Sequence, residues 1–323
     1  MMIERAMSRA LRLVFAGTLA TGMHGAMAQS DDAAIQRVEV TGSSIKRLAS
    51  ETALPITSIK ASDFVKQGLT TAAEVLNTIS MNQSSTTSSQ SVGSGTGGIA
   101  TADLRGLGSN KTLVLLNGRR IANHPFNGSS VDLNIIPLSA LERVEVLRDG
   151  ASAIYGTDAI GGVINFITRR AVQGATVSVE RYQPQASGSG GESRLNLSGG
   201  FGDLDKDGYN FFGVVDLHKQ TALSAVERDF SSTSVRPDRG INNSSGTSQP
   251  GNFFSDNGVT GNPYAASGCV GKGLIAAANG TCRTDTTAYI QSIPKTQQES
   301  FLGKATFKLG GENLGTVEYL HSR

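Results

Sequence analysis

The sequence contains no tryptophan, only two cysteines and only four histidines among its 323 residues. The histidines (His24, His124, His218 and His321) are scattered, and no Ser-His-Asp or Cys-His arrangement accompanies them. We therefore predict no catalytic residues, no bound metal, no cofactor and no enzymatic activity. The formal net charge is only +2, so the basic footprint of a nucleic-acid-binding protein is missing and we expect no nucleic acid partner.

Long apolar runs are also missing from the sequence. Beyond the N-terminus, no segment reaches the roughly 18 apolar residues that a membrane-spanning helix needs. Hydrophobic residues make up 38% of the chain, whereas glycine alone occurs 39 times. This composition favours a strand-rich protein with long polar loops over a compact helical enzyme.

The N-terminus has the pattern of a secretory signal peptide. Arg5, Arg9 and Arg12 precede an apolar run at 13–23, and Ala26-Met27-Ala28 provides a cleavage pattern of small residues. We predict a signal peptide over residues 1–28; the alternative is a buried N-terminal helix. Export would permit a disulfide between Cys269 and Cys282. The alternative is a two-cysteine metal site, but no histidine lies nearby in the sequence.

Residues 45–170 alternate between helix and strand patterns and predict a mixed α+β domain. We expect a strand at 54–60 and helices at 62–68 and 70–79, the second with a capping box of Thr71 and Glu74. Two further strand signals occur at 103–107 and 111–121, and Asn117-Gly118 within the second favours a tight hairpin turn.

The stretch RVEVLRDGASAIYGTDAIGGVINFITRR (143–170) resembles a phosphate-binding loop at first sight. A P-loop, however, requires G-x-x-x-x-G-K-[ST]. Here Gly150 and Gly156 have the wrong spacing, and Thr157-Asp158 stands where the lysine is required. We interpret the segment as strand, turn, helix and strand. Its glycines would permit tight turns and close packing against a surrounding wall.

After Gly174 the pattern changes to alternating strands. One face is apolar: Val177, Val179, Leu195, Leu197, Phe201, Phe211, Val215, Leu217, Phe301, Ala305, Phe307, Val317 and Tyr319. The other is polar: Thr176, Ser178, Glu180, Arg194, Asn196, Asn210, Asp216, His218, Lys304, Thr306, Lys308, Thr316 and Glu318. An apolar outward face indicates a membrane barrel; the alternative is a soluble sandwich with one wet face.

The connections between these strands also favour a membrane barrel. The short turns 202–208 and 310–315 alternate with longer loops at 183–191 and 221–298, as in outer-membrane barrels. Asp203, Asp205 and Asp207 match the first half of a calcium loop. Because Val214 occupies the position where a glutamate is required, we interpret DLDKDG as a solvated turn.

Several motifs resemble one family. DLRGLGSNKTLVLLNGRRI followed by SVDLNIIPLSALERVEVLRDGASAIYGTDAIGGVINFITRR is similar to the plug domain of TonB-dependent outer-membrane receptors, and IQRVEVTGSSI resembles the TonB box that precedes it. The resemblance implies an N-terminal segment with the box at 29–47, a plug domain at 48–173, and about five strands of an incomplete transmembrane β-barrel at 174–323.

The resemblance also implies a function. Such receptors take up large, scarce ligands such as ferric siderophores, haem, cobalamin or oligosaccharides across the outer membrane of a Gram-negative bacterium. The expected partners are TonB with its inner-membrane energising complex, outer-membrane lipid, and a ligand such as a metal chelate or an oligosaccharide. TonB would add an edge strand to the box at Val38, Glu39, Val40 and Thr41.

Further residue roles follow from the resemblance. In this family, plug arginines commonly meet barrel glutamates, so Arg105 and Arg148 are expected to anchor the plug. The family often has Arg-Gly-Pro where this chain has Arg148-Asp149-Gly150, which leaves Asp149 without an assigned role. Ligand contacts are expected from the glycine-rich stretch 90–98 and from His124, Phe126 and Asn127 in the loop 121–130.

The number of strands is smaller than a plugged barrel needs. Such barrels have about 22 strands, whereas only residues 175–323 follow Gly174. We therefore expect the chain to be the N-terminal part of a longer receptor. The alternatives are a truncated, non-transporting periplasmic binding module and an exported hydrolase or nucleotide enzyme.

Overall fold

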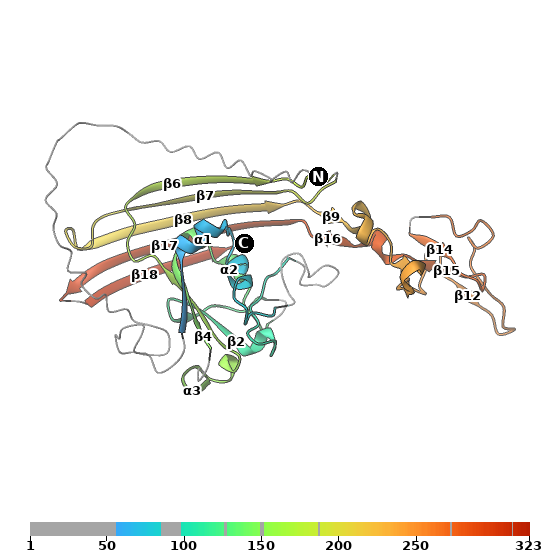
Figure 1. Ribbon diagram of the computed structural model, residues 1–323, viewed down its shortest axis with the longest axis horizontal. Helices are drawn as coiled ribbons and strands as arrows, with labels where there is room; N and C mark the ends of the chain where they lie inside the picture. The colour runs from blue at the N-terminus through green and yellow to red at the C-terminus, as the bar shows by residue number, and fades with distance from the viewer. Residues whose placement is uncertain are drawn as a thin grey trace, which may run out of the picture.

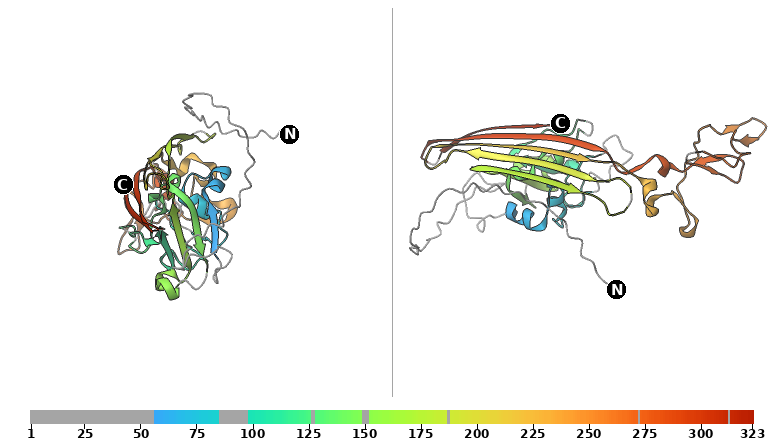
Figure 2. Two further views of the ribbon diagram at one scale, coloured as in Figure 1. Left: turned by 90° about the vertical axis from the view of Figure 1, so that its left-hand side faces the viewer. Right: turned by 90° about the horizontal axis from the view of Figure 1, so that it is seen from above.

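The computed structural model describes residues 56–84, 98–125, 128–148, 152–186, 188–271, 273–311 and 313–323. These residues include two five-stranded sheets. Figure 1 shows the long strands of the second sheet crossing one side of the N-terminal domain, with a thin arm extending beyond their ends. The right-hand view of Figure 2, seen from above, shows the same long strands and the arm beyond them. None of the helices in these residues has the length and apolar content needed to cross a membrane.

The N-terminal domain is built on a mixed sheet with the strand order β1-β4-β5-β2-β3. Its strands are β1 (Ile56–Lys60), β2 (Thr112–Leu116), β3 (Arg119–Arg120), β4 (Leu141–Leu147) and β5 (Gly162–Thr168). Strands β2 and β5 run parallel, and the other neighbours are antiparallel. Its α-helices are α1 (Ala61–Gln67), α2 (Ala72–Asn77) and α3 (Ser152–Tyr155). The α+β prediction is confirmed for this domain.

The predicted capping box and the predicted hairpin turn are both present in the structure. The Thr71 hydroxyl accepts a hydrogen bond from the Glu74 amide at 3.1 Å, and the Glu74 carboxylate accepts one from the Thr71 amide at 3.2 Å. This capping box begins α2. Asn117 and Gly118 have positive φ angles of 50° and 78°, as a type I′ hairpin turn between β2 and β3 requires.

Apolar side chains cover both faces of this sheet. The larger cluster lies beneath α1 and α2 and includes Phe64, Val75, Leu76, Val144, Val146, Ile164 and Phe166. The smaller cluster on the other face consists of Leu113, Leu115, Leu147, Ala159 and Val163. Burying one such large side chain contributes about 1.5–3 kcal/mol, so an apolar core holds the domain together.

Two expectations about this domain are wrong. Residues 103–107 form no strand, because Arg105 and Gly106 both have a φ of 65°, which strands do not allow. The second error concerns Gly161 and Gly162, which pack within the domain and not against the second sheet. A Cβ at Gly162 would lie 2.7 Å from the Leu147 carbonyl oxygen, and one at Gly161 would lie 2.9 Å from that of Lys111.

The second sheet, which we call the wall, is antiparallel throughout and has the order β18-β17-β8-β7-β6. Its strands are β6 (Gly174–Tyr182), β7 (Glu192–Phe201), β8 (Tyr209–Gln220), β17 (Thr296–Gly310) and β18 (Asn313–Ser322). Strand β17 begins before the predicted segment because Thr296 already pairs with Gln220 at the end of β8.

The two faces of the wall are divided as the alternating pattern predicts. Val177 and Val179 on the outer face are 62% and 64% exposed, whereas Asn210 and Thr306 on the inner face are 1% and 2% exposed. The inner face lies against the N-terminal domain (Figure 1). The wall thus exposes apolar side chains and buries polar ones, which is the reverse of a soluble sheet.

The connection from β8 to β17 is a projecting arm, residues 221–295, in the place of the predicted long loop. Its short strands are β9 (Leu223–Ser224), β10 (Val235–Arg236), β11 (Ile241–Asn242), β12 (Phe253–Phe254), β13 (Thr260–Gly261), β14 (Leu274–Ala276), β15 (Cys282–Thr284) and β16 (Gln291–Ile293). Strands β9 and β16 pair with each other at the base of the arm.

Candidate functional site

The wall meets the N-terminal domain along adjoining rows of inner-face residues. The central row is apolar and includes Val214 and Leu302, which are cross-strand partners on β8 and β17. Together with Phe212 they bury Ala140 of the N-terminal domain, and Val172 packs at the edge of this cluster. We call this contact the apolar patch; polar clusters flank it on both sides.

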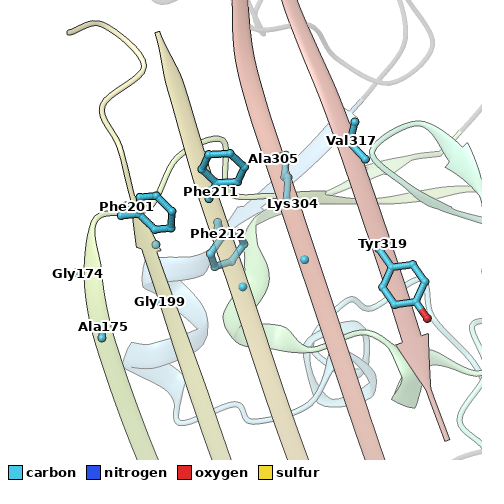
Figure 3. Close-up of a pocket in the computed structure, with 13 residues that line it drawn as sticks. Gly174, Ala175, Gly199, Phe201, Phe211, Phe212, Lys304, Ala305, Val317 and Tyr319 are labelled. Carbon is cyan, nitrogen blue, oxygen red and sulfur yellow. The ribbon is translucent and has the colours of Figure 1, made fainter. Parts of the chain in front are cut away.

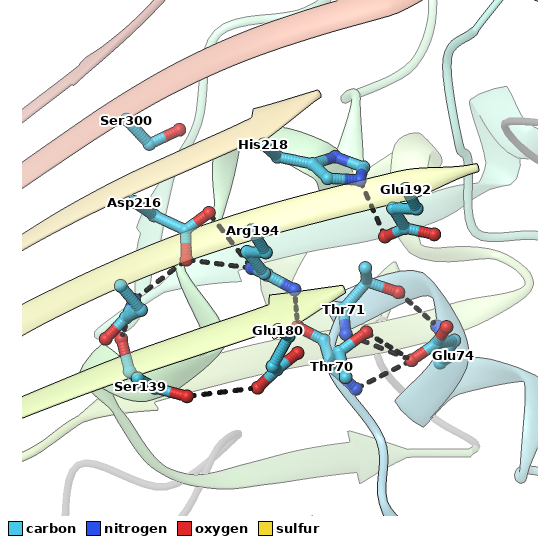
Figure 4. A network of polar contacts seen from close by, with 12 residues as sticks. Thr70, Thr71, Glu74, Ser139, Glu180, Glu192, Arg194, Asp216, His218 and Ser300 are labelled. Carbon is cyan, nitrogen blue, oxygen red and sulfur yellow. Dashed lines mark hydrogen bonds and ion pairs between the residues drawn. The ribbon is translucent and has the colours of Figure 1, made fainter. Parts of the chain in front are cut away.

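The first polar cluster consists of Arg194, Asn196 and Asp216 of the wall and is called the Arg194 cluster (Figure 4). The Arg194 Nε donates to both carboxylate oxygens of Asp216, at 3.1 and 3.0 Å. Its Nη1 donates to the carbonyl oxygen of Thr70 in the N-terminal domain. The Asn196 amide donates to Asp216 at 2.8 Å and to the Ser139 hydroxyl at 2.7 Å.

The start of α2 positions the carbonyl group that Arg194 contacts. Glu74 accepts hydrogen bonds from the amide of Thr70 at 2.7 Å, from its hydroxyl at 3.1 Å, and from the amide of Thr71 at 3.2 Å. The same carboxylate therefore caps α2 and fixes the peptide before it. The Thr70 carbonyl is left available to the wall.

The second polar cluster consists of Lys304 and Glu318, cross-strand partners on β17 and β18, and is called the Lys304 cluster. The Lys304 Nζ donates to the Thr168 hydroxyl at 2.8 Å and to the Arg169 carbonyl oxygen at 3.0 Å. Glu318 accepts a hydrogen bond from the Asn117 side-chain amide at 2.6 Å. These contacts hold the end of β5 and the β2–β3 turn against the wall.

The segment between β5 and β6 follows the wall closely. The Asn210 side chain accepts from the Val172 amide at 3.1 Å and donates to the Val172 carbonyl oxygen at 2.8 Å. A Cβ at Gly200 would lie 2.4 Å from that carbonyl oxygen. Glycine is therefore required at position 200 of β7, where the connecting segment packs against the wall.

The two arginines predicted as anchors lie together at the end of β4. The Arg105 guanidinium donates to the Arg148 carbonyl oxygen at 2.6 Å, and the Arg148 guanidinium donates to the Thr57 hydroxyl on β1. The Arg148 side chain thus contacts the first strand of the domain, and the Arg105 side chain contacts the end of β4. Their pairing with wall glutamates stays a prediction.

The other predicted binding residues are described only in part. Val38, Glu39, Val40 and Thr41 lie outside the described residues, as do Phe126, Asn127 and residues 90–97.

His124 is half-buried, and its amide donates to the Ser130 carbonyl oxygen at 2.8 Å. Near it, burial raises the pKa of Asp132, while amide hydrogen bonds from Ala100 and Asn134 and the charge of His124 oppose the increase.

Hydrogen bonds and one disulfide hold the arm together. Cys269 and Cys282 are joined by the disulfide. Burial alone would raise the pKa of Asp285, but hydrogen bonds from Thr233, Thr287 and Ser234 outweigh it and hold that pKa well below its ordinary value.

Within the described residues, no group of acidic, histidine or cysteine side chains is arranged to bind a metal ion. The sequence 203–208 forms the turn between β7 and β8.

The outer face of the wall carries a shallow apolar cavity of about 590 Å³ (Figure 3). Its floor is a row of small residues, Ala175, Gly199, Gly213 and Gly303, each paired directly with the next across four strands. Phe201 and Phe211 stack beside this row with their ring centroids 5.2 Å apart. This cavity lies on the face opposite the two polar clusters.

The residues that join the domain to the wall were not predicted as anchors. Arg194, Asp216, Lys304 and Glu318 were assigned only to a polar inner face. The sequence signal that could have identified these anchors is the presence of charges of both signs at inward strand positions. Lys304 and Glu318, for example, are direct cross-strand partners. Their contacts on the N-terminal domain are mostly backbone carbonyls and hydroxyls, which no sequence pattern identifies.

Comparison with known proteins identifies the domain that the wall holds. Residues 49–163 match the family model of the TonB-dependent Receptor Plug Domain. The N-terminal domain is a TonB-dependent receptor plug. The match covers most of the plug sheet and its helices. The wall lies outside the matched residues.

Relatives and solved structures agree with this assignment. The chain is 35% identical over 149 residues to "Probable TonB-dependent siderophore receptor PirA" of Acinetobacter baumannii, a match covering 39% of this chain and 19% of that protein. It is 40% identical over 111 residues to "Iron-regulated outer membrane virulence protein" of Vibrio cholerae, covering 32% and 17%. The matches thus span about a fifth of the length of these relatives.

Two solved structures share the fold of the plug and the wall. The ferric enterobactin receptor PfeA of Pseudomonas aeruginosa matches with a TM-score of 0.53 at 18% identity, over 84% of this chain and 33% of that one. The ferric citrate transporter FecA matches with a TM-score of 0.51 at 18% identity, over 84% and 32%. At this identity, the likeness concerns the fold alone.

Proposed function

We propose that this protein is a TonB-dependent outer-membrane receptor that takes up a ferric siderophore or a similar iron chelate. The observation that carries the proposal is the plug match together with 35% identity to a siderophore receptor. Because the match spans 19% of that relative, the ligand and the transport activity are inferred for this protein.

The wall supports a location in the outer membrane. Its exposed face is apolar and its polar face is covered by the plug, an arrangement that suits lipid on one side and a plugged lumen on the other. Residues 1–28 are proposed to be the signal peptide that exports the chain from a Gram-negative cytoplasm. The disulfide of the arm is consistent with an oxidising compartment.

Energy would enter through the N-terminal segment. Residues Val38–Thr41 are proposed to pair with TonB by strand addition. This segment precedes β1, an edge strand of the plug sheet, which pairs only with β4 within the described residues. A pull on the box is therefore transmitted first to β1 and to the Arg148–Thr57 contact. The ligand would bind on the side of the plug that carries the 121–130 loop, and the arm would add contacts.

Growth of a strain lacking the gene tests the proposed ligand class. The strain is supplied with a panel of ferric siderophores, haem, cobalamin and oligosaccharides as the limiting nutrient. We expect a growth defect on one or more ferric siderophores and restoration by the gene on a plasmid. A defect confined to oligosaccharides or cobalamin would replace the iron chelate as ligand while keeping the receptor.

The substitution Val40→Pro tests the assignment of the TonB box. Proline removes a backbone donor from the strand that TonB is proposed to extend. In the protein expressed from its complete gene, we expect uptake of the radiolabelled ligand to be abolished while binding to cells is unchanged. Asp32→Pro, which lies before the box, is the matched control. Unchanged uptake by the Val40→Pro variant contradicts the assignment.

A further inference from the structure

The two polar clusters differ in how the plug residues they contact are tied to the wall. The Lys304 cluster contacts Thr168 and Arg169, and the chain enters β6 of the wall at Gly174. That contact is backed by a short covalent connection. The Arg194 cluster contacts Thr70, 124 residues away in sequence, and its Asn196 contacts Ser139, 57 residues away. This part of the plug can therefore move away from the wall without stretching the linker.

The charges of the Arg194 cluster are balanced within the wall itself. Arg194 and Asp216 are 11% and 8% exposed and pair with each other through the Arg194 Nε. The plug contributes only a carbonyl oxygen and a hydroxyl group to this cluster. Separation of the plug would therefore leave no unpaired buried charge, which is the costly outcome when a buried ion pair is split.

The packing beside this cluster is also incomplete. A cavity of about 180 Å³ lies between the plug and the wall, and its lining includes Phe64, Leu69 and Leu138 of the plug and Ser178 and Glu180 of the wall. Arg194 reaches across its edge to Thr70 (Figure 4). By contrast, Val214 and Leu302 in the apolar patch are 1% and 0% exposed. The seam between plug and wall is weakest where Arg194 crosses it.

We infer that Arg194 is a positioning residue that holds the α1–α2 turn of the plug against the wall, and that the seam opens first at this contact. The Lys304 cluster and the apolar patch then act as the fixed side about which the plug moves. The inference rests on the proposed receptor function, since it assigns the contact that gives way during uptake.

Cysteine labelling measures opening of the seam directly. Cys269 and Cys282 are paired with each other, so an introduced cysteine is the sole free thiol within residues 1–323. Labelling is read from the peptide that carries it. Leu138→Cys places this thiol at the cavity, and Val214→Cys places one in the apolar patch. Each variant of the detergent-solubilised protein, expressed from its complete gene, is labelled with a bulky polar maleimide in the presence or absence of Arg194→Gln.

We expect Arg194→Gln to accelerate labelling of Leu138→Cys at least tenfold, because it removes the charged hydrogen bond to Thr70. The substitution also leaves Asp216 without its partner, and the Val214→Cys rate reports any general loss of stability from that cause. Labelling at Val214→Cys should not change. Lys304→Gln, which removes a charge from the same face, should leave the Leu138→Cys rate unchanged. Arg194→Lys should give an intermediate rate, because one ammonium group cannot serve Asp216 and Thr70 with the geometry of a guanidinium.

Three outcomes would overturn the inference. The first is an unchanged labelling rate of Leu138→Cys in the Arg194→Gln variant. The second is equal acceleration of labelling at Leu138→Cys and Val214→Cys, which indicates general unfolding. The third is an acceleration of Leu138→Cys labelling by Lys304→Gln that equals the effect of Arg194→Gln. The labelling requires neither TonB nor ligand. Loss of the labelling effect therefore counts against the role of Arg194, whereas a normal effect in a protein that transports nothing counts against the proposed function.

Discussion

The plug and the wall are both five-stranded sheets, but they bury opposite kinds of side chain. The plug covers Val144, Ile164 and Phe166 with helices, as a soluble domain does. The wall turns Val177, Val179 and Val317 outward and covers Asn210 and Thr306 with the plug. The plug sheet buries its apolar side chains under its own helices, whereas the wall buries its polar side chains against the plug.

The plug should suffer the largest loss from a change to its core. Phe166 is fully buried, and truncating such a side chain typically costs about 3–5 kcal/mol through lost transfer energy and the cavity left behind. We expect Phe166→Ala to lower the free energy of plug unfolding by this amount in chemical denaturation of the detergent-solubilised protein. Phe254→Ala, at a residue that is 72% exposed in the arm, should change it by less than about 0.5 kcal/mol. Similar effects for the two variants would contradict the assignment of Phe166 to a packed core.

The wall should respond to charge on its outer face. Leu197 lies in the middle of β7 and points outward. If the proposed membrane location is correct, lysine there costs about 2–4 kcal/mol near the bilayer midplane. We expect Leu197→Lys to reduce the yield of folded protein in phospholipid vesicles, measured by heat-modifiable mobility in gels. Leu197→Met, a swap of similar volume, is the control. An equal yield for the lysine and methionine variants would show that this face does not meet lipid.

The arm lies outside this contrast and should show the smallest effect. The pKa of Asp285 is held below its ordinary value of 3.8, so its stabilising contribution is complete above that value and is lost as pH falls through the lower folded pKa. Asp285→Ala should cost about 1 kcal/mol by removing a capping carboxylate. Pepsin cleavage of the arm, normalised to an unstructured peptide at each pH, should rise on acidification in the parent and be high throughout in the variant.

The control for the arm is Asp256→Ala, at an exposed turn between β12 and β13. This substitution should leave the acid-dependent rise of the parent protein in place. A rise that persists in full after Asp285→Ala would assign the acid sensitivity to another group.

The sequence predicts the elements of the plug and the polarity of the wall well, for identifiable reasons. The capping box of Thr71 and Glu74 and the Asn117-Gly118 turn are local, so their geometry follows from neighbouring residues. Period-two alternation places each wall residue on one face once the strand is recognised. The strand expected at 103–107 fails because Arg105 adopts a left-handed conformation that its residue type does not announce.

The contacts between plug and wall are less accessible to prediction. Arg194 binds a backbone carbonyl and Lys304 binds another, and any residue type can present such a group. Phe212, Val214 and Leu302 form an apolar patch on a face that is otherwise polar. Alternation places them on this inner face, but it does not identify the group that they contact. The position of Ala140 in the N-terminal domain explains why this part of the inner face is apolar.

The base of the arm separates two parts of the chain that can vary in length independently of each other. Residues 223–224 and 291–293 pair with each other, and directly beyond them Gln220 pairs with Thr296 to begin the long β8–β17 ladder. The arm is therefore an insertion closed at its own base and stapled internally by its disulfide. Residues beyond that base can be lengthened, shortened or exchanged without shifting the register of the wall.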